Sequence, residues 1–222
     1  AGPPIVIFLG DYVDRGHDSA GVVGMLAAGK PRHCECRYLR GNHEQSLMAF
    51  LENPMANRGW LLQGGAETVM SYGVRPPPFN GSAEAWRQAA DELRARMPAA
   101  HLEFLNGLER YIELGDYAFV HAGVDDTRSL ADQPDEALYW SRDSFLSSKR
   151  SFSHRVVHGH TPVDRPYADA RRIAVDTGAY ASGTLTAARF EGEALTFLSV
   201  RRPNVTVSTP SRTVLADQVD WG

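Results

Sequence analysis

The chain has 222 residues, 43% hydrophobic and 23% charged, with a formal net charge of −4. These values are typical of a globular protein with a full core, and they exclude disordered and fibrous chains. The sequence has no basic run interleaved with aromatic residues, so we expect no nucleic-acid partner. It also has no apolar run as long as the about 20 residues that span a bilayer. We therefore expect a cytoplasmic protein without a membrane partner.

Five short apolar segments are predicted to be buried strands, and each runs directly into residue types that bind metals or phosphate. They are residues 5–9, 37–39, 117–120, 155–157 and 172–175. Open α/β sheets bind ligands outside the carboxyl ends of their strands. We therefore expect the Asp, Asn and His residues that follow these strands to build a single site.

The first two of these strands are predicted to be parallel. Residues 18–29 between them are mostly small or apolar and end in a Gly-Lys-Pro stop signal, which predicts a helix. Strand, helix and strand together have the size of a βαβ unit, and its right-handed crossover lays the strands parallel. The side chains that this unit brings together are Asp11, Asp14, Arg15, Asn42 and His43.

The middle of the chain is predicted to be a helical cap of about residues 45–115, with helices at 45–51, 66–72, 83–97 and 98–110. Alternating residues at 184–190 and 194–200, separated by Glu191-Gly192, predict a hairpin. We expect one catalytic domain over residues 1–200, followed by an extended tail at 201–222.

The residue types at the strand ends indicate a metal site beside a phosphate site. One Asp, one Asn and two His form a mixed oxygen and nitrogen set, which favours manganese, iron or zinc over magnesium or calcium. Arg15, Arg40 and Arg142 carry guanidinium groups that match phosphate oxygens, although Arg40 could instead pair with a carboxylate. Metal and arginine together indicate phosphoryl transfer or hydrolysis.

Five segments resemble the motifs of the calcineurin-like metallophosphoesterases, in particular the bacterial serine/threonine phosphoprotein phosphatases. They lie at residues 10–16, 40–44, 121–123, 140–142 and 159–161. The resemblance implies an α/β, four-layer fold with two mixed β-sheets sandwiched by helices, a helical cap and two divalent metal ions. Manganese is the favoured metal, with iron or zinc as alternatives.

The resemblance also implies roles for individual residues. Asp11 would bridge the two metals, and the second metal would be completed by Asn42, His121 and His160. His43 would be the general acid, with Asp14 orienting its ring. Arg15 and Arg142 would hold the phosphate. His158 and His160 lie two residues apart and would face the same way in an extended strand, so either could be the ligand; the motif favours His160.

One feature of the family is absent from this sequence. The family's first metal also takes an Asp and a His from an Asp-x-His motif at the end of the preceding strand, and no Asp-x-His occurs in the 222 residues. If the sequence is complete as given, the resemblance implies that the first metal site is incomplete and that one strand of the sheet is absent. The alternative is that the motif lies in a segment upstream of Ala1.

The expected activity is hydrolysis of phosphomonoesters by in-line attack of a metal-bound hydroxide, with phosphoserine or phosphothreonine of proteins, or a small phosphoester, as substrate. One alternative is a symmetrical diadenosine-tetraphosphate hydrolase. Another, of a different class, is a catalytically impaired relative that only binds phosphoproteins. The oligomeric state is left open by the sequence.

Overall fold

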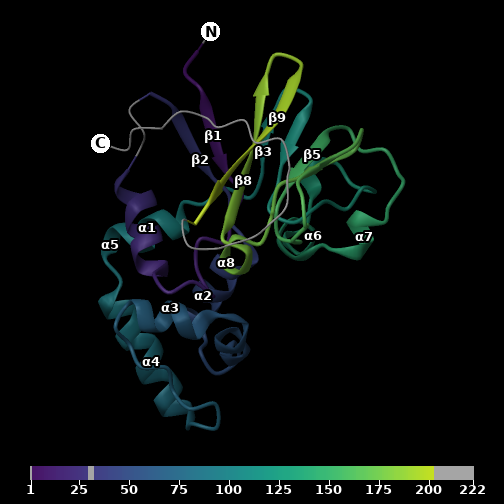
Figure 1. Cartoon of the computed structure of the whole chain (residues 1–222). Helices are drawn as coiled ribbons and strands as arrows, with labels where there is room; N and C mark the ends of the chain where they lie inside the picture. Colours follow the sequence, from purple (N-terminus) through teal and green to yellow (C-terminus); the bar gives the residue numbers. More distant parts are fainter. Residues whose placement is uncertain (1, 30–32, 203–222) are drawn as a thin grey trace. The chain divides into compact units, whose positions relative to one another are not determined.

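A computed structural model describes residues 2–29 and 33–202 (Figure 1). The chain divides into two compact units, Ala1–Arg110 and Tyr111–Gly222. The predicted tail 201–222 lies outside the described residues, apart from its first two positions. The expectation of one catalytic domain over residues 1–200 stays a prediction.

The first unit begins with the predicted βαβ arrangement. Strand β1 (Ile5–Phe8) and strand β2 (Glu35–Tyr38) pair in parallel and flank helix α1 (Ser19–Ala28). The α1 N-terminus is capped by Asp18, whose side chain accepts a hydrogen bond from the Gly21 N–H. The βαβ prediction is therefore confirmed, and the segments that follow β1 and β2 leave the same end of the pair.

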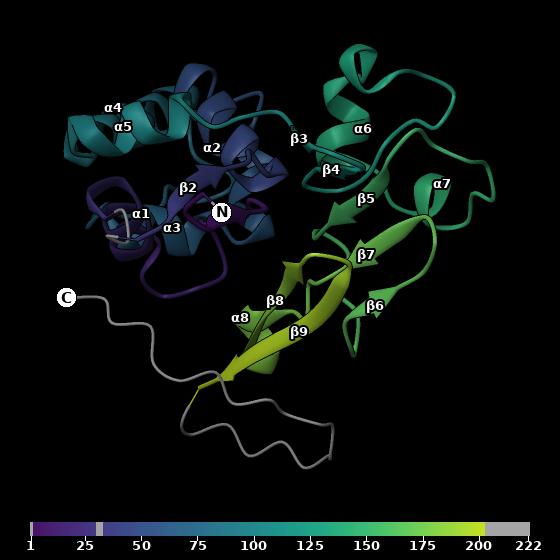
Figure 2. The same cartoon turned by 90° about the horizontal axis from the view of Figure 1, so that it is seen from above.

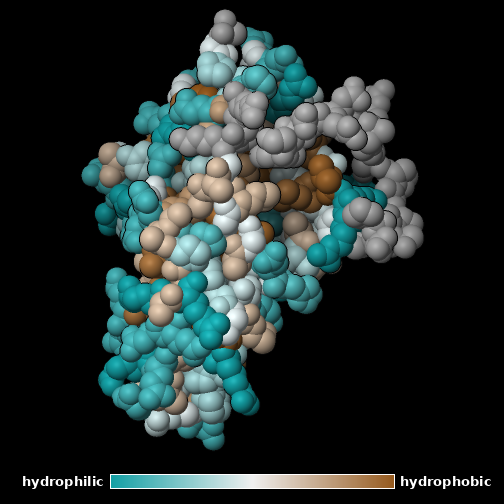
Figure 3. Space-filling view, turned by 90° about the vertical axis from the view of Figure 1, so that its left-hand side faces the viewer, coloured by the Kyte–Doolittle hydropathy of each residue, from teal (hydrophilic) through white to brown (hydrophobic). Residues whose placement is uncertain are grey.

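The rest of the first unit is helical. It contains α2 (Asn42–Glu52), the 3-10 helix η1 (Arg58–Gln63), α3 (Gly65–Ser71), α4 (Ala83–Arg96) and α5 (Ala99–Asn106). Helix α4 follows from its pattern, because buried Trp86, Ala89, Ala90 and Leu93 recur at helical spacing and Ser82 caps its start. The opposite face of the helix is hydrophilic, as the lower end of the view in Figure 3 shows.

Two segments of the predicted cap are not helical. Helix α5 ends at Asn106 rather than at Arg110, because Glu109 pairs with Leu39 beside β2: the Glu109 N–H donates to Tyr38 O and the Arg40 N–H donates to Glu109 O, both at 2.9 Å. These backbone bonds replace the helical ones. Residues 112–114 form strand β3 (Ile112–Leu114), which opens the second unit.

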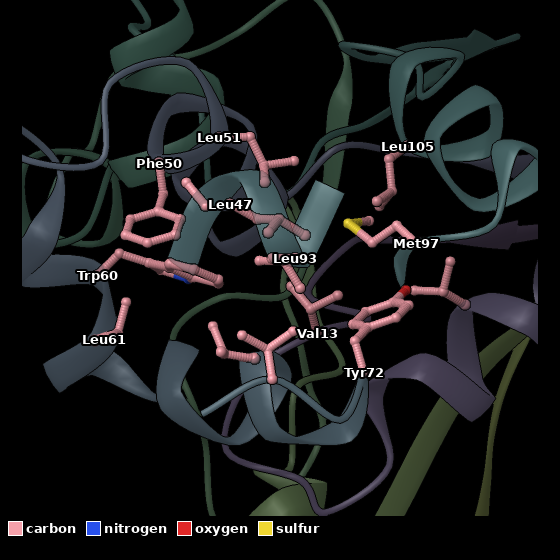
Figure 4. Packing of buried hydrophobic residues seen from close by; sticks show 14 of the residues in the cluster. Val13, Leu47, Phe50, Leu51, Trp60, Leu61, Tyr72, Leu93, Met97 and Leu105 are labelled. Atoms are coloured by element: carbon pink, nitrogen blue, oxygen red, sulfur yellow. The ribbon is translucent and has the colours of Figure 1, made fainter. Parts of the chain in front are cut away.

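The core of the first unit joins its helices to the loop after β1. Figure 4 shows Val13, Leu47, Phe50 and Leu93 among the buried side chains of this cluster, with the Trp60 indole beside the Phe50 ring. The two ring centroids lie 5.0 Å apart. The Val13 side chain is 3% exposed, so its burial in this core anchors the loop residues on either side of it.

The second unit is built on a five-stranded mixed sheet in the order β3-β4-β5-β7-β6. Its further strands are β4 (Tyr117–Phe119), β5 (Arg155–His158), β6 (Tyr167–Ala168) and β7 (Arg172–Ala174). Figure 2 shows β4, β5, β7 and β6 following one another across the sheet. Strands β4, β5 and β7 are mutually parallel, so the segments after them emerge at one edge.

The remaining elements of the second unit are short helices and one hairpin. The helices are η2 (Leu130–Asp132), α6 (Asp135–Trp140), α7 (Asp143–Leu146) and α8 (Ala179–Ser182). Strands β8 (Thr184–Glu191) and β9 (Ala194–Arg201) pair in antiparallel register, which confirms the predicted hairpin. The mixed α/β class with helices and several sheets is confirmed, but the five strands that carry the predicted site residues divide between two sheets, one in each unit.

None of the helices among residues 2–29 and 33–202 combines the length and apolar character needed to cross a membrane. The cytoplasmic location stays a prediction.

Candidate functional site

Left-handed backbone marks the predicted site residues. In the described part of the chain, the non-glycine residues with positive φ are Asp11 (61°), Asp14 (76°), Arg15 (63°) and His160 (61°). Such a conformation costs of order 1–3 kcal/mol per residue, and it persists only where surrounding contacts enforce it. All four residues belong to the set predicted from the sequence, so the strain coincides with the predicted site.

Glu44 enforces the backbone of the loop after β1. This fully buried carboxylate accepts hydrogen bonds from Asp11 N–H (2.9 Å) and Gly41 N–H (2.8 Å) at Oε2, and from Tyr12 N–H (2.6 Å) and Val13 N–H (3.2 Å) at Oε1. Hydrogen bonds to an ionised acceptor are about twice as strong as neutral ones. Glu44 thus holds the Asp11 loop against the start of α2.

Replacing Glu44 by Gln should lower the free energy of unfolding by at least about 2 kcal/mol, because an amide N–H₂ would face buried backbone donors that then lose their acceptor. The measurement is urea denaturation in the presence of a metal chelator, so that metal binding does not contribute. Glu52→Gln, at an exposed position of the same helix, is the control and should stay within about 0.5 kcal/mol of the parent. Equal losses in the two variants would contradict the role of Glu44.

The start of α2 brings Asp11, Asn42 and His43 together. Asn42 and His43 open the helix and are each 3% exposed, and the His43 N–H faces Asp11 Oδ1 at 3.4 Å. A carboxylate is favoured at a helix N-terminus by the helix dipole. Gly41 permits this approach, because a Cβ there would lie 2.3 Å from Asp11 Oδ1.

Asp14 and His43 form a buried pair. His43 Nδ1 lies 2.5 Å from Asp14 Oδ2, and both side chains are almost inaccessible to solvent. Burial lowers the pKa of His43, but the hydrogen bond to Asp14 and the negative charges of Asp11 and Asp14 outweigh it, so the pKa is raised overall. The ring is therefore protonated to a higher pH than an ordinary histidine, and its second nitrogen, Nε2, remains for proton transfer.

Two further side chains contact the Asp14 carboxylate. Trp60 Nε1–H donates to Oδ2 at 2.7 Å, and the Thr68 hydroxyl donates to Oδ1 at 2.6 Å. The Asp14 N–H in turn donates to Thr68 Oγ1 at 2.8 Å. The sequence analysis assigned no role to either residue.

The three predicted phosphate-binding arginines differ in their surroundings. Arg15 is exposed, and its N–H donates to Gly64 O at 3.1 Å. The Arg40 guanidinium instead donates to the Leu105 and Asn106 carbonyl oxygens, each at 3.2 Å, at the end of α5. A cation is favoured at this end of a helix. These contacts give Arg40 a structural role at the end of α5, and phosphate binding by Arg40 stays a prediction.

In the second unit, His121 and His160 follow the adjacent parallel strands β4 and β5. His121 Nε2 and His160 Nδ1 lie 3.2 Å apart, and the two residues are 1% and 6% exposed. Two nitrogens bound to one ion at about 2.0–2.1 Å are this far apart when the angle between the bonds is about 100°, between octahedral and tetrahedral values. The donor pair therefore fits a shared transition metal.

His158 faces a different way from His160. Its Nδ1 lies 3.1 Å from Gly159 O, and its Nε2 lies 3.2 Å from Arg172 Nη1. Burial, with a contribution from the Arg172 charge, lowers its pKa to about 4. The two histidines do not continue one extended strand, because β5 ends at His158 and the chain turns left-handed at His160. The choice of His160 as the ligand stays a prediction.

Arg142 is an exposed residue at the start of α7, the helix that packs against the histidine segments. Phe145 of this helix lies edge-on to the His158 ring, with 5.2 Å between centroids. A Cβ on Gly123 would lie 2.6 Å from the same phenyl ring. The Gly of the His-Ala-Gly segment thus allows α7 to approach, and phosphate binding by Arg142 stays a prediction.

Glu44, Trp60 and Thr68 are the contacts that the sequence analysis missed. A sequence signal for Glu44 exists. It stands at the third helical position after the N-cap Gly41, where a Glu side chain often accepts a hydrogen bond from the N-cap backbone. Trp60 and Thr68 lie 46 and 54 residues from Asp14, and no local pattern connects them with it.

The family model described as Calcineurin-like phosphoesterase matches residues 1–193. The asymmetrical bis(5'-nucleosyl)-tetraphosphatase PrpE of Geobacillus thermodenitrificans is 26% identical over 197 residues, which cover 82% of this chain and 74% of the relative. Serine/threonine-protein phosphatase 1 of Salmonella typhimurium is 27% identical over 191 residues, which cover 84% of this chain and 79% of the relative. A solved structure of a candidate diadenosine tetraphosphatase matches with a TM-score of 0.57 and 18% identity, covering 89% of this chain and 80% of that one.

Proposed function

Because this chain belongs to the calcineurin-like phosphoesterase family, we propose that it hydrolyses phosphomonoesters, with phosphoserine or phosphothreonine of proteins as the substrate class. The family and its phosphatase-named relatives support a hydrolase. The alternative of a relative that only binds phosphoproteins is therefore not carried further.

The observation that carries the proposal is the buried Asp14–His43 pair. An alkoxide leaving group from serine or threonine needs a proton as the P–O bond breaks, whereas the phosphate released from an anhydride does not. A histidine whose Nδ1 is held by a buried carboxylate can supply that proton from Nε2. The pair is thus of most use for phosphate esters of alcohols.

Two exposed guanidinium groups, those of Arg15 and Arg142, are proposed to bind the phosphoryl oxygens. The family is metal-dependent, and the predicted ligands are Asp11, Asn42, His121 and His160. The donor chemistry fits manganese, iron or zinc. When bound, such an ion acts as a Lewis acid that neutralises phosphate charge and activates water.

A second candidate function is hydrolysis of a dinucleoside polyphosphate. The observation that favours it is the set of relatives named bis(5'-nucleosyl)-tetraphosphatase, which are 25–29% identical to this chain. Those relatives carry the asymmetrical name, so the candidate is cleavage into unequal products, whereas the alternative given in the sequence analysis was a symmetrical hydrolase.

The test compares two substrates with the same manganese-supplied protein: a peptide containing phosphoserine or phosphothreonine and diadenosine tetraphosphate. The proposal expects a higher kcat/KM for the phosphopeptide, measured as phosphate release. A higher kcat/KM for the dinucleotide, with unequal nucleotide products by chromatography, would replace the proposal with the second candidate. No turnover of either substrate by a protein that also carries an upstream Asp-x-His segment would reject both.

A further inference from the structure

We propose that Trp60 and Thr68 are positioning residues, which fix the Asp14 carboxylate so that it holds His43 in one orientation for proton transfer. This inference rests on the proposed function, because it assigns to both residues a part in the same acid step. Neither residue needs to contact the substrate.

The contacts of Asp14 leave its carboxylate one orientation. Oδ1 accepts from Thr68 Oγ1 at 2.6 Å, and Oδ2 accepts from Trp60 Nε1 at 2.7 Å beside His43 Nδ1 at 2.5 Å. Rotation of the carboxylate about its Cβ–Cγ bond would break at least one of these bonds. Without them, Oδ2 could leave the plane of the His43 ring while still contacting Nδ1.

Thr68 acts on the backbone of Asp14 as well as on its side chain. Its Oγ1 accepts the Asp14 N–H at 2.8 Å while its hydroxyl hydrogen goes to Oδ1, and Thr68 is fully buried. Asp14 has a φ of 76°, a conformation that needs such support. One side chain thus constrains both the left-handed backbone and the carboxylate.

The segment that supplies Trp60 and Thr68 is itself closely packed. The Trp60 indole lies against Phe50, as Figure 4 shows, and Gly65 lies against the indole so closely that a Cβ there would be 2.4 Å from its Cε2. Gly64, at φ 108°, accepts the Arg15 N–H. A rigid support is what a positioning role requires, because a mobile one would transmit its motion to His43.

The test separates proton transfer from folding by varying the leaving group. Phenyl phosphate needs a proton on its leaving oxygen more than 4-nitrophenyl phosphate does, because nitrophenolate is the more stable anion. Trp60→Phe and Thr68→Val should each lower kcat for phenyl phosphate by about 10-fold, part of the about 10²–10⁴ that a general acid supplies. The loss should be smaller for 4-nitrophenyl phosphate, with KM nearly unchanged.

Three comparisons make the outcome specific. Trp86→Phe also removes a fully buried indole beside Phe50, but in the described part of the chain its Nε1 has no hydrogen-bond partner, so it should leave the ratio of the two substrates unchanged. Thr68→Ser keeps the hydroxyl and should restore activity. Trp60→Phe added to His43→Asn should cause no further loss.

Two results would overturn the inference. In the first, kcat of His43→Asn falls more for phenyl phosphate than for 4-nitrophenyl phosphate, but kcat of Trp60→Phe and Thr68→Val does not. In the second, Trp60→Phe and Trp86→Phe change the ratio of the two kcat values equally. If His43→Asn itself shows no dependence on the leaving group, His43 is not the acid and the inference is rejected with it, while phosphomonoester hydrolysis is still decided by the comparison of the phosphopeptide with the dinucleotide. Circular dichroism and thermal denaturation of each variant identify the folded fraction, to which every rate is normalised.

Discussion

Replacing His43 by Asn is expected to lower kcat for a phosphomonoester by about 10²–10⁴-fold, the usual contribution of a general acid or base. Asn cannot donate a titratable proton, and it lacks the ring that Asp14 Oδ2 contacts at 2.5 Å. Asp14→Asn is expected to lower kcat through the same step, because the remaining imidazole loses the carboxylate that orients it and raises its pKa.

The double variant shows whether the two residues act together. Since both losses concern one proton transfer, the combined loss should be well below the product of the single losses. His17→Asn, an exposed histidine of the same loop, is the matched control and should keep the parent rate. If the losses of His43→Asn and Asp14→Asn multiply, the two residues act independently and the pair has no common role.

Replacing His121 by Ala is expected to remove most of the bound manganese and with it most of the turnover. His121 Nε2 lies 3.2 Å from His160 Nδ1, a separation that suits two ligands of one ion. His160→Ala should have the same effect. The measurement is the metal content of dialysed protein by elemental analysis, together with calorimetric titration of metal-free protein with manganese.

His158 provides the control, since both of its ring nitrogens already have protein partners in Gly159 and Arg172. His158→Asn should therefore keep the metal content per folded molecule, even where its stability falls. Unchanged metal in His121→Ala would mean that the two histidines form an ordinary hydrogen-bonded pair. Metal loss in His158→Asn but not in His160→Ala would move the ligand to His158.

The sequence by itself indicated most of the elements that carry the predicted site residues. Strands β1 and β2 with α1 between them, strands β4, β5 and β7, and the β8–β9 hairpin were predicted from patterns within a few residues of each element. The parallel pairing of β4, β5 and β7 was seen only in the structure. The predicted βαβ unit brought Asp11, Asp14 and His43 together, and the resemblance to the family's motifs supplied their expected roles. Local patterns suffice for single elements because backbone propensity and hydrophobic alternation act over a few residues.

The supports of the site were decided only by the tertiary structure. Glu44 holds the backbone of residues 11–13 across more than 30 positions of sequence, and Trp60 and Thr68 reach Asp14 across 46 and 54. The partners of Arg40, carbonyl oxygens at the end of α5, could not be foreseen because they exist only where that helix stops. Helix α5 is shorter than predicted because Glu109 pairs with Leu39. A hydrogen bond between distant residues leaves no periodicity in the sequence, since its geometry depends on how the whole backbone folds.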